Sequence, residues 1–323
     1  MRTTPSSLSS GSLRLRALLH DLLLRLRSRP LPAADRSASG GSRPGGQGDG
    51  QPDQRRRLVA ALEGGEIRPW FQPQINSLTG EISGAEALVR WQDPQRGLLL
   101  PGAFLDAVER HELGERLSRL VLRQALEALA RWEAEGLEMP VIAVNFTGSD
   151  LRAPDLARHI RRELDHFGLS PRRLVIEVLE TVCAMGEEDQ LINNLTRLEA
   201  MGCGIDLDDF GTGYASFASL RRLPVHRLKI DGAYIHQIDQ DRELQKMVAD
   251  IVMMAGELGL ETLAEGVETA GEQVVLTELG CGYLQGFGIA RPMAPELIPA
   301  WIRAHQAGSH SGAARAQRVA ARG

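Results

Sequence analysis

Short β-rich segments alternate with longer amphipathic segments through most of this 323-residue chain, and this alternation restricts the fold more than any other feature. The β-rich segments are residues 68–74, 81–91, 141–146, 174–179, 204–208, 227–231, 261–264 and 282–288. The main helical segments are residues 113–135, 154–167, 189–201, 241–258 and 270–279. Such alternation indicates a largely parallel sheet, and this number of strands predicts an α/β fold, a TIM-like (β/α)8 barrel. A short turn at residues 76–80 joins the first two strands without a helix, so we expect one antiparallel strand near the N-terminal start of the domain.

The two ends of the chain differ in composition from its centre. Residues 1–54 are rich in Ser, Gly, Pro and Arg, which predicts a disordered, basic region. Within it, residues 13–27 place leucines on one helical face flanked by arginines, which predicts an amphipathic helix in peripheral contact with a membrane. A helix that docks onto a partner, or a mis-assigned start codon, are the alternatives. We expect the barrel to span residues 55–306 and residues 307–323 to be a disordered tail.

Cysteine usage and charge narrow the classes of function. The three cysteines, Cys183, Cys203 and Cys281, are widely spaced and odd in number, which argues against a disulfide framework and favours a cytoplasmic location, with membrane association through residues 13–27. Residues 1–57 carry a net charge of +7 and the remainder −12. An acidic globular part does not favour binding of a DNA or RNA polymer, and it favours metal chemistry.

Metal-capable side chains fall at or just inside the C-terminal ends of successive predicted strands. They are Glu86, Asn145, Glu177, Asp208, Asp209, Lys229, Asp231, Glu265, Glu268 and Gln285. Each has an ordinary explanation when taken alone, such as a turn or a helix cap, but the strand ends of a closed barrel meet in one bowl. This oxygen-rich set, without a Cys or His cluster, suits Mg²⁺ or Mn²⁺ better than zinc. Lys229 adds weight because it is one of only two lysines in an Arg-rich chain.

These segments resemble the motifs of EAL-domain phosphodiesterases over roughly residues 55–305. The matching motifs are FQP at 71–73, EALVRW at 86–91, VNF at 144–146, EVLET at 177–181, DDFGTGY at 208–214, LKID at 228–231, AEGVET at 264–269, QGF at 285–287 and RP at 291–292. The departures are few, with Ala215 in place of the usual Ser, His226 in place of the usual Asp, and Gly282 and Gly288 in place of bulkier residues. None of these departures removes a ligand.

The resemblance implies metal-dependent hydrolysis of cyclic di-GMP to linear 5′-pGpG. It implies a two-metal site for Mg²⁺ or Mn²⁺, held by Glu86, Asn145, Glu177, Asp208 and Asp209. It implies that the catalytic residues are Glu86, Lys229 and Glu265. Substrate contacts are expected from Gln72, Leu88, Arg90, Asp231, Glu268 and Gln285, and Glu180 is expected to brace the loop at 208–214. Members of the family often pair through this loop, so a homodimer is also expected.

Two other functions are compatible with parts of this pattern. The first is a catalytically silent module that acts as a cyclic di-GMP receptor or an interaction platform, but such modules usually lack a ligand and this chain keeps the full set. The second is a Mg²⁺-dependent barrel that acts on enolates. It would explain carboxylates at strand ends, but not the motifs at 86–91 and 208–214.

Overall fold

The computed structural model describes residues 51–184, 189–211 and 220–307. The expected amphipathic helix at 13–27, most of the expected disordered N-terminal region and nearly all of the expected C-terminal tail lie outside these ranges. Helix α2 (Gln51–Glu63) begins slightly ahead of residue 55, where we expected the barrel domain to start.

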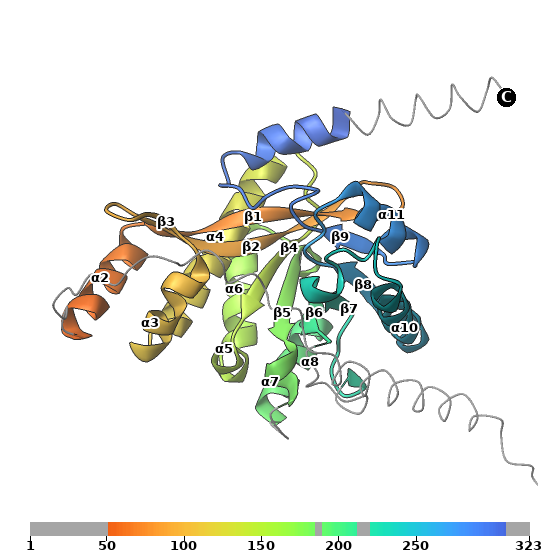
Figure 1. Ribbon diagram of the computed structural model, residues 1–323. Coiled ribbons are helices and arrows are strands. Elements are labelled where there is room, and N and C mark those ends of the chain that lie inside the picture. The colour runs from red at the N-terminus through yellow and green to blue at the C-terminus, as the bar shows by residue number, and fades with distance from the viewer. Residues whose placement is uncertain (1–50, 185–188, 212–219, 308–323) are drawn as a thin grey trace, which may run out of the picture.

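The described strands form a closed ring in the order β1-β9-β8-β7-β6-β5-β4-β2, which closes through pairing of β1 with β2 (Figure 1). Their bounds are β1 (Ile67–Asn76), β2 (Ile82–Asp93), β4 (Ile142–Phe146), β5 (Leu174–Leu179), β6 (Gly204–Phe210), β7 (Arg227–Ile230), β8 (Glu261–Ala264) and β9 (Tyr283–Gln285). Strand β1 is antiparallel to both neighbours, and the other pairs in the ring are parallel. The predicted barrel and its single antiparallel strand are therefore confirmed. An unpredicted short strand, β3 (Gly97–Leu99), pairs with the end of β2 outside the ring.

The helices connect successive strands and lie outside the ring (Figure 1). The long ones are α4 (Gly114–Ala134), α6 (Leu156–Phe167), α8 (Asp189–Met201), α10 (Arg242–Leu258) and α11 (Ala270–Glu278), all close to their predicted bounds. The short helices α3 (Leu105–Arg110), α5 (Gly148–Arg152) and α7 (Glu180–Ala184) were not predicted. Local signals fix the ends of α10: the Asp241 carboxylate accepts from the first-turn N–H groups of Glu243 and Leu244, and Gly259 ends the helix at φ 72°.

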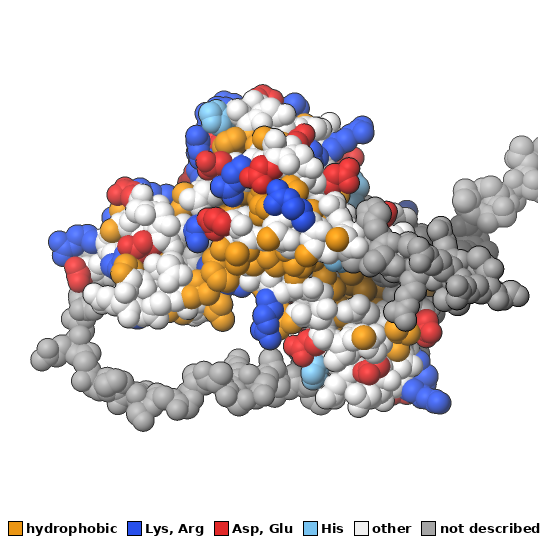
Figure 2. All heavy atoms as spheres, turned by 90° about the horizontal axis from the view of Figure 1, so that it is seen from above, with side chains coloured by type: hydrophobic (Ala, Val, Ile, Leu, Met, Phe, Trp, Pro, Cys, Tyr) orange, Lys and Arg blue, Asp and Glu red, His pale blue; other side chains and the backbone are white. Residues whose placement is uncertain are grey.

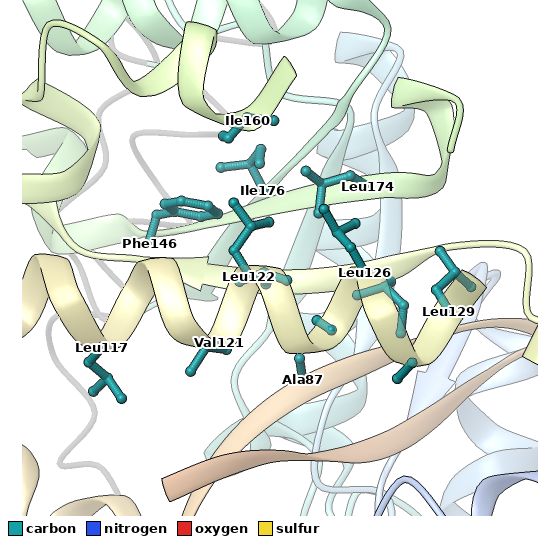
Figure 3. Close-up of a cluster of buried hydrophobic side chains, with 14 of the residues drawn as sticks. Ala87, Leu117, Val121, Leu122, Leu126, Leu129, Phe146, Ile160, Leu174 and Ile176 are labelled. Carbon is teal, nitrogen blue, oxygen red and sulfur yellow. The ribbon is translucent and has the colours of Figure 1, made fainter. Parts of the chain in front are cut away.

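Helix α4 shows how the outer faces of the strands are buried. Its apolar residues recur at helical spacing, so one side of the helix covers the sheet. Leu122 and Leu126 point toward Ile176 and Leu174 of β5 (Figure 3). A second apolar cluster covers the other half of the ring, where α10 packs against β7 and β8. The outward-facing residues of the strands thus supply the hydrophobic core.

The alternate residues of the same strands point into the ring, since successive side chains leave a strand on opposite faces. In β6 the outward residues Ile205 and Leu207 belong to the apolar clusters, so Asp206 and Asp208 point inward. In β7 Leu228 and Ile230 are outward in the same way, which leaves Lys229 inside. The barrel interior is therefore charged.

The outer surface is mixed in character. Seen from above, hydrophobic side chains form a band bordered by Lys, Arg, Asp and Glu (Figure 2). Within the described ranges, every helix is too short or too polar to cross a lipid bilayer.

Candidate active site

The Lys229 ammonium lies at the centre of a group of carboxylates that come from four other parts of the ring. Its Nζ is 2.9 Å from Glu177 Oε1, 2.9 Å from Asp208 Oδ1 and 2.8 Å from Glu265 Oε1. Glu86 Oε2 is 3.6 Å away. The side chain of Lys229 is completely buried, so it meets its charge partners without competing water. We call Lys229 and these four carboxylates the lysine cluster.

Two amide side chains hold Glu86 and Glu177 in this arrangement. Asn145 Nδ2 donates to Glu86 Oε1 at 2.7 Å and to Glu177 Oε2 at 2.9 Å. Gln285 Nε2 donates to the other oxygen of Glu86 at 2.6 Å. Because the amide nitrogen of Asn145 faces the carboxylates, its side-chain oxygen is left available as a ligand. Glu86 was expected at the end of its strand, and this was wrong: β2 runs from Ile82 to Asp93, so Glu86 lies in its middle.

Asp208 and Asp209 lie where the pairing of β6 with β7 shifts register between Leu207 and Phe210. Asp209 has φ 55°, a left-handed conformation that is uncommon for a residue other than glycine. The irregularity lets consecutive residues serve one site, although neighbours in a regular strand point to opposite faces. Carboxylate oxygens of Asp208, Asp209 and Glu265 all lie within 4.8 Å of one another. Strain of this kind is typical of a functional site.

Burial and crowding shift the pKa values of the cluster in different directions. Burial and then the Glu86 charge raise the pKa of Glu177 well above its usual value, despite Lys229. Burial raises the pKa of Glu265 to about 8 although Lys229 opposes it, and burial together with Asp208 raises that of Asp209 to about 6. Burial acts in the same direction on Glu86, but Lys229 and the donors Gln285 and Asn145 outweigh it and lower the pKa of Glu86. One ammonium is thus too little positive charge for this many carboxylates.

The oxygen atoms of this site fit divalent cations for two reasons. A cation beside Asp208, Asp209 and Glu265 would lower the raised pKa values of Asp209 and Glu265, because an opposite charge favours the ionised form. Carboxylate and amide oxygens are the ligands that Mg²⁺ and Mn²⁺ prefer. Glu86 and Glu177 converge on Lys229, so in the described structure the ammonium stands where these two carboxylates meet.

Just after Asp208 and Asp209 along the chain, two side chains form hydrogen bonds with the backbone of Gly211. Glu180 is buried, and its Oε2 accepts from the Gly211 N–H at 3.0 Å. The Tyr234 hydroxyl donates to the Gly211 carbonyl at 2.7 Å. Glu180 is thus in contact with the loop at 208–214 that it was expected to brace, while residues 212–214 of that loop lie outside the described ranges. Tyr234 was missed from the sequence, because only its position in the fold brings it to this loop.

The predicted substrate-binding residues do not all reach the same place. Gln72 and Arg90 are buried and Leu88 is half-buried, and by strand alternation all three face the interior, as Glu86 does. The side chain of Asp231 caps a local turn by accepting from the Ala233 N–H at 2.7 Å.

Of the other two predicted substrate-binding residues, Glu268 stands apart from this group, whereas Gln285 donates to Gln72 within it. Glu268 is exposed, and the described contacts do not link its side chain to the lysine cluster. Gln285 touches Glu86, so it belongs to the support of the cluster.

Comparisons with known proteins show which family the chain resembles. Residues 55–292 match the EAL domain family. The chain is 39% identical over 245 residues to the bifunctional diguanylate cyclase/cyclic di-GMP phosphodiesterase MucR of Pseudomonas aeruginosa, covering 76% of this chain and 36% of that protein. It is 34% identical over 237 residues to the cyclic di-GMP phosphodiesterase RocR of the same organism, covering 73% of this chain and 60% of that protein.

A solved structure extends the likeness to three dimensions. It is described as the PaMucR phosphodiesterase in complex with c-di-GMP, and it shares 38% identity at a TM-score of 0.71, covering 76% of this chain and 99% of that one. The chain spans about a third of the length of most of the curated relatives that it matches. On the family match and these identities, the chain belongs to the EAL domain family.

Proposed function

We propose that this chain hydrolyses one phosphodiester of cyclic di-GMP to give linear 5′-pGpG, with two divalent cations, Mg²⁺ or Mn²⁺. The lysine cluster carries this proposal, because it gathers an excess of carboxylates around one buried ammonium in the interior of the barrel. The names of MucR and RocR, both described as cyclic di-GMP phosphodiesterases, support the choice of substrate.

Each part of the site has a chemical task. Divalent cations would be held by Glu86, Asn145, Glu177, Asp208 and Asp209. When bound, they would supply positive charge for the phosphodiester oxygens and lower the pKa of water. Lys229 Nζ would hold the attacking water in place by donating to it, and would offset the negative charge that develops on the phosphate. Glu265, whose Oε1 is 2.8 Å from that nitrogen, would accept the proton of the water.

The remaining side chains would bind the nucleotide. The Arg90 guanidinium suits a phosphate oxygen because it is planar and permanently charged. Burial lowers its pKa, with Glu86 acting in the opposite direction, so the group lies in a weakly hydrated environment where a phosphate would bind more strongly. Gln72 and Leu88 would line the nucleotide cleft. A cytoplasmic location, a homodimer and contact of residues 13–27 with a membrane remain parts of the proposal.

The experiment is to measure binding and cleavage of cyclic di-GMP side by side for the full chain and for the Glu86→Gln variant. Chromatography of the products should show pGpG with the wild-type protein and Mg²⁺ or Mn²⁺. The variant should form less than about a hundredth as much, because the glutamine amide lacks the negative charge of the Glu86 carboxylate and so holds a divalent cation more weakly. If the wild-type protein bound cyclic di-GMP tightly but did not cleave it, the chain would be a cyclic di-GMP receptor and not an enzyme. Equal cleavage by both proteins would remove Glu86 from the site.

A further inference from the structure

Below the lysine cluster, the barrel interior contains a second polar layer that the proposed mechanism does not use. Asp206, Arg227 and Gln74 are buried and lie on β6, β7 and β1. Arg227 Nε donates to Asp206 Oδ2 at 2.8 Å. A second nitrogen of the same guanidinium, Nη2, donates to Gln74 Oε1 at 3.3 Å. Asp206 therefore anchors Arg227, and Arg227 reaches across the ring to Gln74.

From Gln74 a line of hydrogen bonds leads up to the site. Gln74 Nε2 donates to Gln285 Oε1 at 2.7 Å. Gln285 Nε2 then donates to Glu86 Oε2 at 2.6 Å and to Gln72 Oε1 at 3.2 Å. Gln72 Nε2 in turn donates to the Ala290 carbonyl at 3.0 Å.

The groups at the two ends of this line of hydrogen bonds fix which atom of each amide donates and which accepts, because each end group can only donate or only accept. A guanidinium can only donate, so Gln74 must turn its oxygen toward Arg227 and its nitrogen toward Gln285. A backbone carbonyl can only accept, so Gln72 must turn its nitrogen toward Ala290 and its oxygen toward Gln285.

Both ends therefore impose the same orientation on Gln285. If its amide were rotated by half a turn, its oxygen would face Glu86 Oε2 and Gln72 Oε1, and its nitrogen would face the Gln74 nitrogen. Two acceptor–acceptor contacts and one donor–donor contact would replace three hydrogen bonds, all in a buried site where an unmade hydrogen bond costs most.

We propose that Gln74 and Arg227 are positioning residues that act through Gln285, keeping an N–H donor on Glu86 so that this carboxylate is aimed correctly as a metal ligand. This inference rests on the proposed function, which makes Glu86 a ligand. When a side chain that hydrogen-bonds to a metal ligand and orients it is replaced, the affinity for the metal commonly falls by roughly 10- to 100-fold.

The test is Mn²⁺ binding to the full chain, followed by electron paramagnetic resonance, in wild type and Gln74→Glu. A carboxylate at 74 can accept from Arg227 but cannot donate to Gln285, so an acceptor–acceptor contact replaces the hydrogen bond that helps to orient the Gln285 amide, and the donor to Glu86 is held less firmly. The expected result is a Kd for Mn²⁺ that rises about tenfold. Simple attraction between Mn²⁺ and an added negative charge predicts the opposite, a lower Kd, so the sign separates orientation from charge.

Two further variants complete the experiment. Arg227→Lys keeps the charge beside Asp206 but lacks the fork that reaches Gln74, so it should weaken Mn²⁺ binding in the same direction, and it decides the question if Gln74→Glu does not fold. Asn194→Asp is the matched control. This buried amide donates to the carbonyls of Leu151 and Ala153, away from the cluster, so its loss should lower the melting temperature and leave the Kd for Mn²⁺ within about twofold.

The outcomes separate this inference from the proposed function. An unchanged or lower Kd in folded Gln74→Glu, with wild type binding Mn²⁺ and cleaving cyclic di-GMP, overturns the positioning role alone. Absence of Mn²⁺ binding by the wild-type protein overturns the proposed function, and the positioning role with it. A rise in Kd for Gln74→Glu and Arg227→Lys, but not for Asn194→Asp, supports the inference.

Discussion

Replacement of Lys229 by methionine tests the lysine cluster most severely. Methionine keeps most of the length of the lysine stem but not the charge, so Glu177, Asp208 and Glu265 would lose a cation that lies within 2.9 Å of each of them. Removing one partner from a buried ion pair typically costs about 3–5 kcal/mol in the free energy of unfolding. In a domain of this size such a loss corresponds to a fall in melting temperature of about 6–10 °C.

The assay is thermal unfolding of the full chain in chelator and in saturating Mg²⁺. In chelator, Lys229→Met should melt far below wild type. In Mg²⁺ most of the difference should disappear, because the cation replaces the lost charge, while cleavage of cyclic di-GMP should remain absent. The only other lysine provides the control: Lys246 is exposed and pairs with Glu243 at 3.2 Å, so Lys246→Met should change stability by less than about 1 kcal/mol. If Lys229→Met were as stable as wild type in chelator, the carboxylates of the lysine cluster would not depend on the Lys229 charge.

Three further predictions concern the surroundings of the site. Gly286→Ala should yield an unstable protein, because its Cβ would lie 2.1 Å from the Val267 carbonyl oxygen, and a melting temperature equal to that of wild type would contradict this close approach. Tyr234→Phe removes the donor to the buried Gly211 carbonyl and should lower the free energy of unfolding in urea by about 1–3 kcal/mol, so a change near zero would show that this bond adds no stability. Cys203 is buried, and burial raises the pKa of its thiol to about 11. Iodoacetamide at neutral pH should therefore leave Cys203 unlabelled in the folded protein, which mass spectrometry can check. Rapid labelling would mean that the segment around Cys203 opens.

The barrel could be predicted from sequence because its elements have clear periods. Helix α4, for example, has an apolar stripe on one face, and the long predicted helices are found close to their predicted bounds. Strand β3 was missed because it spans only Gly97–Leu99 and depends on pairing with the end of β2, which sequence periodicity does not reveal. Glu86 lies in the middle of β2, as it does in the predicted segment 81–91, so it should not have been counted among the strand ends.

The candidate site was predictable in outline only. Convergence of Glu177, Asp208 and Lys229 follows from parallel strands in a closed ring, and this part needed no coordinates. The left-handed backbone of Asp209 could not be predicted, because it depends on how β6 and β7 shift register. The bond from Arg227 to Gln74 was also missed, since it joins residues 153 positions apart whose common depth in the barrel appears only once the ring is closed.

The most direct test of the central claim is the dependence of cyclic di-GMP cleavage on divalent metal. The full chain would be treated with chelator, freed of it, and assayed for pGpG with and without added Mg²⁺ or Mn²⁺. We predict no product without metal and restored product with either cation, since the lysine cluster lacks the positive charge that a phosphodiester requires. Cleavage that survives complete removal of metal, with Glu86→Gln equally active, would contradict the claim that these carboxylates form a metal-dependent active site.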